Sequence, residues 1–250
     1  MDKKTLLIFV LGGLLAVIVA ASGVAYVQSQ EQFQELAEVR LDPLGIAQFP
    51  TGPDRALPES DRRVVFFGDS RAQNWPPPSG LLQRAQLINR GIGRQTTAQA
   101  LGRFDRHVAG LRPKIVVIQL GVNDLTKIAV LPERRDAIVA ACEKNIDEIV
   151  ARSKGLGAHV ILTTIFPIGV LPIYRKLFWS NKVNEAISEV NKHLLGLGDV
   201  DVSVLDSAPL LVDDHGVIRS ELSHDFLHLN AAGYQVLDRA LVPLVAKLLG

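Results

Sequence analysis

The feature that most constrains the fold of this 250-residue chain is a series of short apolar runs after residue 61. The runs are rich in β-branched residues and do not alternate apolar with polar positions, which is typical of strands covered on both faces. They lie at residues 64–67, 87–88, 115–120, 160–165 and 202–205. This part of the chain therefore favours a sheet buried in the middle of a domain.

Helical patterns separate these apolar runs. The clearest one begins at Pro132 and Glu133, a favourable helix start, and repeats apolar residues at helical spacing. Alternation of strands and helices implies a parallel sheet with right-handed crossovers. We predict one α/β domain over residues 62–250, with three layers (α/β/α) and a five-stranded parallel sheet. Its helices are expected near residues 96–110, 133–154, 178–196 and 230–248.

The N-terminal residues 1–27 predict a membrane anchor. The 23 residues from 5 to 27 carry no charge, and a membrane-spanning helix needs about 20 apolar residues. Lys3 and Lys4 precede this stretch, which favours an N-terminus in the cytoplasm and a single-pass protein whose domain lies on the extracytoplasmic side. A signal peptide cleaved near Ala21-Ser22-Gly23 is the alternative, and it also exports the domain. Residues 28–61 show no clear periodicity and are expected to form a linker.

Composition excludes some partners and cofactors. A net charge of +1 gives no sign of a nucleic-acid-binding surface. Cys142 is the one cysteine, so no intrachain disulfide can form, and its apolar helical setting predicts a buried thiol. Asp213, Asp214 and His215 lack a second cluster of ligands, so no metal site is predicted.

Two short motifs directly follow predicted strands. Ser70 follows the first strand in Gly68-Asp69-Ser70, and Asn123 follows the third in Gly121-Val122-Asn123-Asp124. In open α/β sheets, ligands bind beyond the carboxyl ends of the strands. Ser70 is therefore a candidate nucleophile, and the Asn123 amide is a candidate donor to an oxyanion. The structural alternatives are a helix cap at residues 69–70 and an Asx turn at Asn123.

Two further motifs complete the set of groups that acyl transfer needs. Residues 89–93, Asn-Arg-Gly-Ile-Gly, form a loop after the second strand. Asp225 and His228 lie three residues apart in one loop before the last helix. The Asp225 carboxylate can accept a hydrogen bond from one ring nitrogen of His228, which leaves the other nitrogen to face Ser70.

The order of these motifs, Ser, Gly, Asn, then Asp and His, resembles the SGNH hydrolase family, also called the GDSL esterases and lipases. The resemblance covers residues 62–248 and implies a flavodoxin-like α/β/α fold. It also implies that Ser70, Asp225 and His228 are the catalytic residues, and that neither a metal nor a cofactor takes part.

The resemblance further implies an oxyanion hole. Its donors would be the backbone N–H of Ser70, the side chain of Asn123, and a backbone N–H of the second motif. The family usually carries a glycine at the position that Arg94 occupies here, so either Arg94 or Gly93 supplies that donor. If the position requires a positive φ, an arginine is strained there.

The family includes lipases, lysophospholipases, thioesterases, arylesterases and carbohydrate deacetylases. We therefore predict a membrane-anchored serine ester hydrolase that acts on a small-molecule, lipid or carbohydrate ester. Two alternatives stay open: acyl (acetyl) transfer or deacetylation on a cell-envelope polysaccharide, and an inactive binding module that retains the fold. Residues 125–131 and 166–179 follow the third and fourth strands, so we expect these loops to overhang the site.

Overall fold

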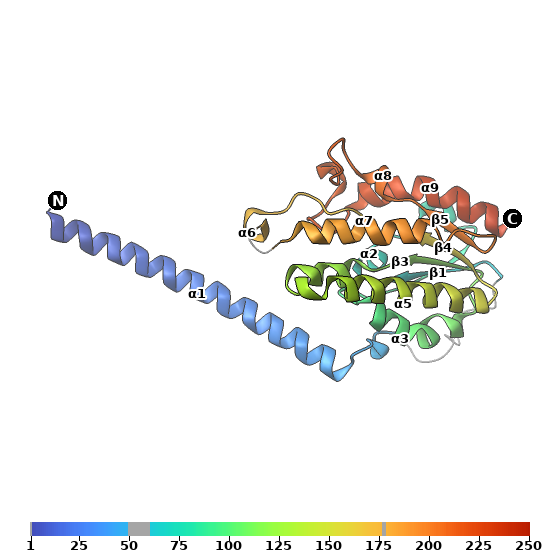
Figure 1. Ribbon diagram of the computed structural model, residues 1–250, viewed down its shortest axis with the longest axis horizontal. Coiled ribbons are helices and arrows are strands. Elements are labelled where there is room, and N and C mark those ends of the chain that lie inside the picture. The colour runs from blue at the N-terminus through green and yellow to red at the C-terminus, as the bar shows by residue number, and fades with distance from the viewer. Residues whose placement is uncertain (1, 50–60, 177–178) are drawn as a thin grey trace. The chain divides into compact units, whose positions relative to one another are not determined.

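The structure of the protein is a computed structural model that describes residues 2–49, 61–176 and 179–250. The chain divides into two compact units, Met1–Pro43 and Leu44–Gly250. The second unit is built on a five-stranded sheet (Figure 1). Its strand order is β2-β1-β3-β4-β5, and all neighbouring strands are parallel. The predicted five-stranded parallel sheet is therefore confirmed.

The burial of each strand follows its place in the sheet. Every residue of the central strands β1 and β3 is buried, whereas the edge strands β2 and β5 are partly exposed. This agrees with the sequence, where the run of central β3 covers residues 115–120 and the run of edge strand β2 only residues 87–88. The strands are β1 (Arg63–Gly68), β2 (Gln86–Gly91), β3 (Ile115–Gln119), β4 (His159–Thr163) and β5 (Val202–Leu205).

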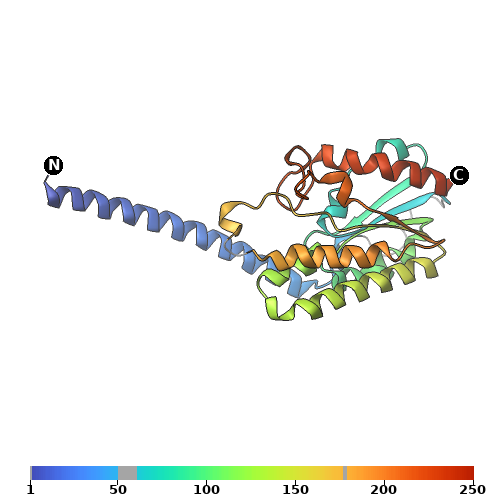
Figure 2. The same cartoon turned by 45° about the horizontal axis from the view of Figure 1, so that its top comes forward.

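Helices cover both faces of the sheet, which confirms the three-layer arrangement (Figure 2). One face packs against α3 (Thr97–His107), α5 (Arg135–Gly155) and α7 (Asn181–Leu195). The other face packs against α8 (Ala208–Leu211) and α9 (Ala231–Leu249). Cys142 is fully buried in the first of these cores, as its apolar setting predicts.

Short helices connect the main elements. Besides α8, three of them are single α-helical turns: α2 (Ser70–Gln73), α4 (Val122–Leu125) and α6 (Ile173–Lys176). The 3₁₀ turns are η1 (Ile46–Gln48), η2 (Ser79–Leu81), η3 (Ala109–Leu111), η4 (Thr126–Ala129), η5 (Pro132–Arg134) and η6 (Ser220–Leu222). The helix expected over 96–110 thus ends at His107, and a 3₁₀ turn completes the stretch.

The first unit is a single helix, α1 (Lys3–Leu41), of 39 residues. The Asp2 side chain caps its start by accepting a hydrogen bond from the Thr5 backbone N–H. At 1.5 Å per residue, the uncharged stretch 5–27 is about 35 Å long, enough to cross a hydrocarbon core of about 30 Å. The helix is therefore a candidate membrane span by length and composition. It also includes residues 28–41, the first part of the expected linker.

Residues 44–49, also within the expected linker, pack on the second unit. The side-chain amide of Gln95 donates to the Leu44 carbonyl at 2.8 Å. The Phe49 ring stands edge-on to the imidazole of His107, with ring centroids 5.1 Å apart. This segment therefore belongs to the folded domain. Residues 50–60 of the expected linker lie outside the described part of the chain.

Candidate active site

The turn after β1 presents Ser70 at the carboxyl end of the sheet. Gly68 ends the strand with φ +156°, and a Cβ atom there would lie only 1.8 Å from the backbone oxygen of Gln119. Asp69 then caps α2, because its buried carboxylate accepts the backbone N–H of Arg71 at 2.9 Å. Ser70 is the first residue of this helix and is partly buried. The glycine thus permits a tight turn, and the turn carries the hydroxyl out of the core.

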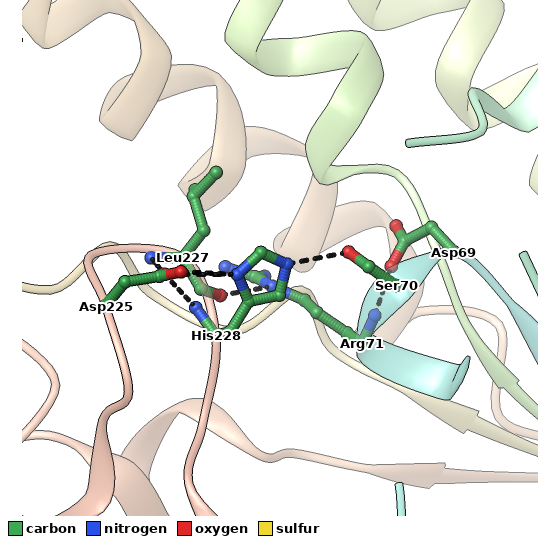
Figure 3. A network of polar contacts seen from close by, with 6 residues as sticks. All are labelled: Asp69, Ser70, Arg71, Asp225, Leu227 and His228. Atoms are coloured by element: carbon green, nitrogen blue, oxygen red, sulfur yellow. Dashed lines mark hydrogen bonds and ion pairs between the residues drawn. The ribbon is translucent and has the colours of Figure 1, made fainter. Parts of the chain in front are cut away.

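Ser70, His228 and Asp225 form a continuous chain of hydrogen bonds (Figure 3). The Ser70 Oγ lies 2.9 Å from His228 Nε2. His228 Nδ1 lies 2.8 Å from Asp225 Oδ2 and 3.1 Å from Oδ1. With a proton on Nδ1, the imidazole leaves Nε2 free to accept from a hydroxyl. The structure therefore brings together the three residues that the sequence selects.

The Asp225 carboxylate also fixes the backbone of its own loop. Its Oδ1 accepts the backbone N–H of Leu227 at 2.7 Å and that of His228 at 2.8 Å. Partial burial acts to raise the pKa of Asp225, but hydrogen bonds from the His228 ring and these backbone groups outweigh it. The pKa of Asp225 consequently lies below its ordinary value. The carboxylate stays ionised at neutral pH, as an orienting acceptor must.

Asn123 lies in the first turn after β3, at the neighbouring strand end. Gly121 begins this turn with φ +117°. The Asn123 side-chain amide donates to the backbone carbonyl of Gln95 at 3.0 Å. One N–H of the amide is thereby occupied, which fixes its orientation and leaves the second N–H for another acceptor. The bond also ties this turn to the loop after β2.

The loop after β2 passes close to the serine turn. A Cβ atom on Gly93 would lie 3.8 Å from the Cβ of Ser70 and 2.9 Å from Oε1 of Gln73. Arg94 is exposed and has φ +65°, the left-handed conformation in which a side chain is disfavoured. The position where the family usually carries glycine thus has the backbone that glycine adopts most easily.

Two buried residues of this region escaped the sequence analysis. Arg71 and Gln95 are both buried, although charged and amide side chains are usually exposed. Burial also raises the pKa of Asp69 to about 6, against the opposing charge of Arg71. The one sequence signal for Arg71 is its place directly after Ser70, and that place alone does not indicate burial.

The structure also bears on the residues that we set aside as metal ligands. Asp213 uses its Oδ1 atom to accept the backbone N–H groups of His215 and Val217, which makes a turn. Across residues 2–49, 61–176 and 179–250, no group of three or more His, Cys, Asp or Glu side chains is arranged to hold a metal ion.

The geometry at Ser70 can support nucleophilic catalysis. A serine hydroxyl becomes a nucleophile when an adjacent imidazole takes its proton, and a carboxylate on the second ring nitrogen stabilises the imidazolium that results. Helix N-termini and side-chain amides stabilise negative charge that develops on a carbonyl oxygen. Every one of these groups lies at or next to the turns after β1, β2 and β3 and in the Asp225–His228 loop.

Known proteins with similar sequences include subunits of platelet-activating factor acetylhydrolases. The chain is 28% identical to human platelet-activating factor acetylhydrolase IB subunit alpha1 over 200 residues, which cover 76% of this chain and 78% of that protein. It is 27% identical to the bovine alpha2 subunit over 192 residues, which cover 74% of this chain and 77% of that protein.

Solved structures share the fold. A GDSL-like lipase from Bacteroides thetaiotaomicron superposes with a TM-score of 0.63 at 21% identity, covering 84% of this chain and 98% of that one. The acetyl xylan esterase AlAXEase superposes with a TM-score of 0.58 at 22% identity, covering 73% and 99%.

The family itself is assigned by the sequence that spans the site. Residues 66–236 match the model of the GDSL-like lipase/acylhydrolase family. They include Ser70, Asn123, Asp225 and His228, and they make up more than half of the chain. The chain therefore belongs to the GDSL-like lipase/acylhydrolase family of ester-bond hydrolases.

Proposed function

We propose that the protein is a membrane-anchored serine ester hydrolase that uses Ser70, His228 and Asp225. The observation that carries this proposal is the chain of hydrogen bonds from Ser70 Oγ to His228 Nε2 and from His228 Nδ1 to Asp225. A hydroxyl, an imidazole and a carboxylate in this order are the groups of a serine-hydrolase triad.

The reaction proceeds in two acyl-transfer steps. His228 Nε2 takes the proton of Ser70 as Oγ attacks the ester carbonyl, and Asp225 stabilises the imidazolium. His228 then gives the proton to the departing alcohol, which leaves an acyl group on Ser70. Water, deprotonated by His228, attacks this acyl-enzyme and releases the acid.

Three donors stabilise the oxyanion in this mechanism. The first is the backbone N–H of Ser70 at the start of α2. The second is the free N–H of the Asn123 amide, whose other N–H binds the Gln95 carbonyl. The third is the backbone N–H of Gly93 or Arg94, in the loop that passes beside Ser70. A backbone donor at residue 94 does not depend on its side chain, so the arginine is compatible with this role.

We infer that acetyl or similarly short esters are the substrates. The human relative is named for acetyl hydrolysis, and one structural neighbour is an acetyl xylan esterase. The alcohol part of the ester would meet an apolar rim. The exposed Val170 follows Gly169, whose backbone N–H donates to the Phe226 carbonyl of the Asp225–His228 loop at 2.9 Å.

The anchoring part of the proposal rests on α1. Its uncharged stretch is long enough to span a bilayer, and Lys3 and Lys4 precede it, so the domain would lie outside the cytoplasm. Alkaline carbonate should fail to release the protein from membranes, and protease added outside should reach the domain. A soluble product that begins near Val24 would instead reveal a cleaved signal peptide.

The decisive experiment measures hydrolysis of p-nitrophenyl acetate by the purified full chain. The wild-type protein should turn the ester over, and a fluorophosphonate should label Ser70 alone. Ser70→Ala should lose both. The matched control is Ser203→Ala, because Ser203 also lies 2.9 Å from a histidine, His159, at another part of the sheet.

Each outcome of this experiment selects one reading. Absence of both turnover and labelling in the wild type would leave an inactive binding module with this fold. Labelling at Ser70 with slow release of acetate, but rapid acetylation of an added oligosaccharide, would identify an acetyltransferase. Loss of activity in Ser203→Ala but not in Ser70→Ala would refute the assignment of the nucleophile.

A further inference from the structure

Arg71 is a fully buried arginine next to the proposed nucleophile. Its side chain has 0% exposure, and no other described arginine except Arg103 is buried to that extent. Burying a guanidinium is costly unless its donors find acceptors, so such a residue is expected to hold something in place.

The Arg71 guanidinium joins two loops that are far apart in sequence. Its Nε donates to the backbone carbonyl of Leu227 at 2.9 Å, and its Nη1 donates to that of Phe166 at 2.8 Å. It also lies over the Phe166 ring, 5.0 Å from the centroid. One arginine thereby connects the serine turn, the loop after β4 and the loop that carries Asp225 and His228. Figure 3 shows the contact with Leu227 in the last of these loops.

Leu227 is the residue through which Arg71 contacts the Asp225–His228 loop. Its N–H is bound by Asp225 at 2.7 Å, and its carbonyl is bound by Arg71. The next residue is His228, so the peptide groups on both sides of Leu227 are held immediately before the residue that carries the imidazole. Charge-assisted hydrogen bonds of this kind are stronger than neutral ones.

The backbone of Arg71 is fixed as firmly as its side chain. Its N–H is bound by the Asp69 carboxylate at 2.9 Å, and its carbonyl accepts the Tyr234 hydroxyl of α9 at 2.8 Å. Because residue 71 follows Ser70 directly, its fixed side chain links the turn that carries Ser70 to the loop that carries His228.

We infer that Arg71 is a positioning residue that holds the Asp225–His228 loop at hydrogen-bonding distance from Ser70. The inference rests on the proposed function, because the distance between Ser70 and His228 matters for catalysis only if the two residues react together. A lysine in its place keeps the charge but cannot donate to the Leu227 and Phe166 carbonyls from a planar fork.

The charge of Arg71 has a second effect on the site. Asp69, Tyr234 and Asp225 are the titratable groups whose charges act on the guanidinium. Burial lowers the pKa of Arg71 to about 10, so the group is still a cation at neutral pH. A buried cation beside Asp225 favours the ionised carboxylate.

The test compares Arg71→Lys and Arg71→Met in the full chain. Misplacement of a catalytic group by about 1 Å can cost about 100-fold in rate, so kcat should fall about 100-fold for Arg71→Met and about 10-fold for Arg71→Lys. KM should change by no more than about twofold, because the ester does not contact Arg71.

Arg63→Met is the matched control. Arg63 is another buried arginine that binds a side chain and a carbonyl, Gln86 and Leu111, but it lies at the amino end of β1. This variant should lower the melting temperature without moving kcat. If Arg71→Met behaves in the same way, Arg71 is only structural and the inference is overturned. If Arg71→Met does not fold, Arg71→Lys decides by the same criteria.

Hydrogen exchange separates this inference from the proposed function. The backbone N–H groups of Leu227 and His228 should exchange faster in Arg71→Lys than in the wild type, and Arg63→Met should leave them unchanged. This holds even if the wild-type chain hydrolyses no ester, in which case the proposed function fails alone. Unchanged exchange in Arg71→Lys, with turnover intact, would refute the positioning role.

Discussion

Two serine–histidine pairs with equal oxygen–nitrogen distances lie at different parts of the same sheet. Ser70 Oγ is 2.9 Å from His228 Nε2, and Ser203 Oγ is 2.9 Å from His159 Nε2. His159 is the first residue of β4, so the second pair lies toward the amino end of its strand. The first pair lies beyond the carboxyl end of β1.

The surroundings of the pairs differ more than the pairs themselves. His228 has a carboxylate on its second nitrogen, whereas no hydrogen bond between His159 and a carboxylate occurs in the described part of the chain. Burial lowers the pKa of His159, and the charges of Asp201 and Asp199 only oppose it from a distance. A serine–histidine contact is therefore not a site by itself. The helix start, the orienting carboxylate and the neighbouring amide donors distinguish the first pair.

Removal of the orienting carboxylate should produce the largest change. Asp225→Asn should lower kcat about 1,000- to 10,000-fold, because the amide no longer stabilises the imidazolium and can favour the wrong tautomer. Steady-state kinetics with p-nitrophenyl acetate measure this. Asp201→Asn, beside the second pair, is the control and should keep wild-type turnover. Equal losses in both variants would mean that the two pairs are not distinguished by their carboxylates.

The oxyanion donors should produce the next largest effect. Asn123→Ala should lower kcat about 100- to 1,000-fold with little change in KM, since removal of one donor acts on the transition state. The exposed Asn184 on α7 provides the control, and Asn184→Ala should retain full activity. A change confined to KM would make Asn123 a substrate-binding residue.

The buried carboxylate behind the first pair should affect stability more mildly. Burial raises the pKa of Asp69 from 3.8 to about 6, so the folded protein holds this proton more tightly than the unfolded chain. Stability from this group is therefore greatest below pH 3.8 and declines as the pH rises to about 6. Above that pH, the charge on Asp69 lowers the free energy of unfolding by about 3 kcal/mol.

Asp69→Asn removes this cost and keeps an oxygen to cap α2. Its free energy of unfolding, relative to the wild type, should therefore rise by about 2.4 kcal/mol between pH 4 and pH 8. Urea unfolding followed by the fluorescence of the buried Trp75 measures the difference. A difference that stays constant with pH would show that Asp69 does not titrate in this range.

The sheet and the neighbourhood of the site were predictable for the same physical reason. Buried parallel strands require continuous apolar runs, and their carboxyl ends meet at one edge of the sheet. Ser70 and Asn123 directly follow such runs, so their convergence on one edge could be expected before any coordinates were known. Asp225 and His228 are close in sequence and needed only a tight loop to meet.

The remaining features depend on contacts that no local pattern encodes. Arg71 is buried because it finds carbonyls 95 and 156 residues away in the chain. The contact between His159 and Ser203 joins residues 44 positions apart on adjacent strands. The left-handed backbone of Arg94 is not indicated by the arginine itself, and the glycine that the family usually carries there is the one signal for a positive φ. Charge and residue type indicate exposure only on average, and tertiary acceptors override them.

The packing of residues 44–49 on the domain bears on how this enzyme can be re-engineered and how it can evolve. Gln95 binds both Leu44 and Asn123, so residues 44–49 help to hold the loop beside Ser70 in place. A different N-terminal segment can be joined before Leu44 without removing these contacts. A graft that begins at residue 62 would discard them. The N-terminal helix is thus best exchanged at the short stretch Asp42-Pro43, rather than at the start of the first strand.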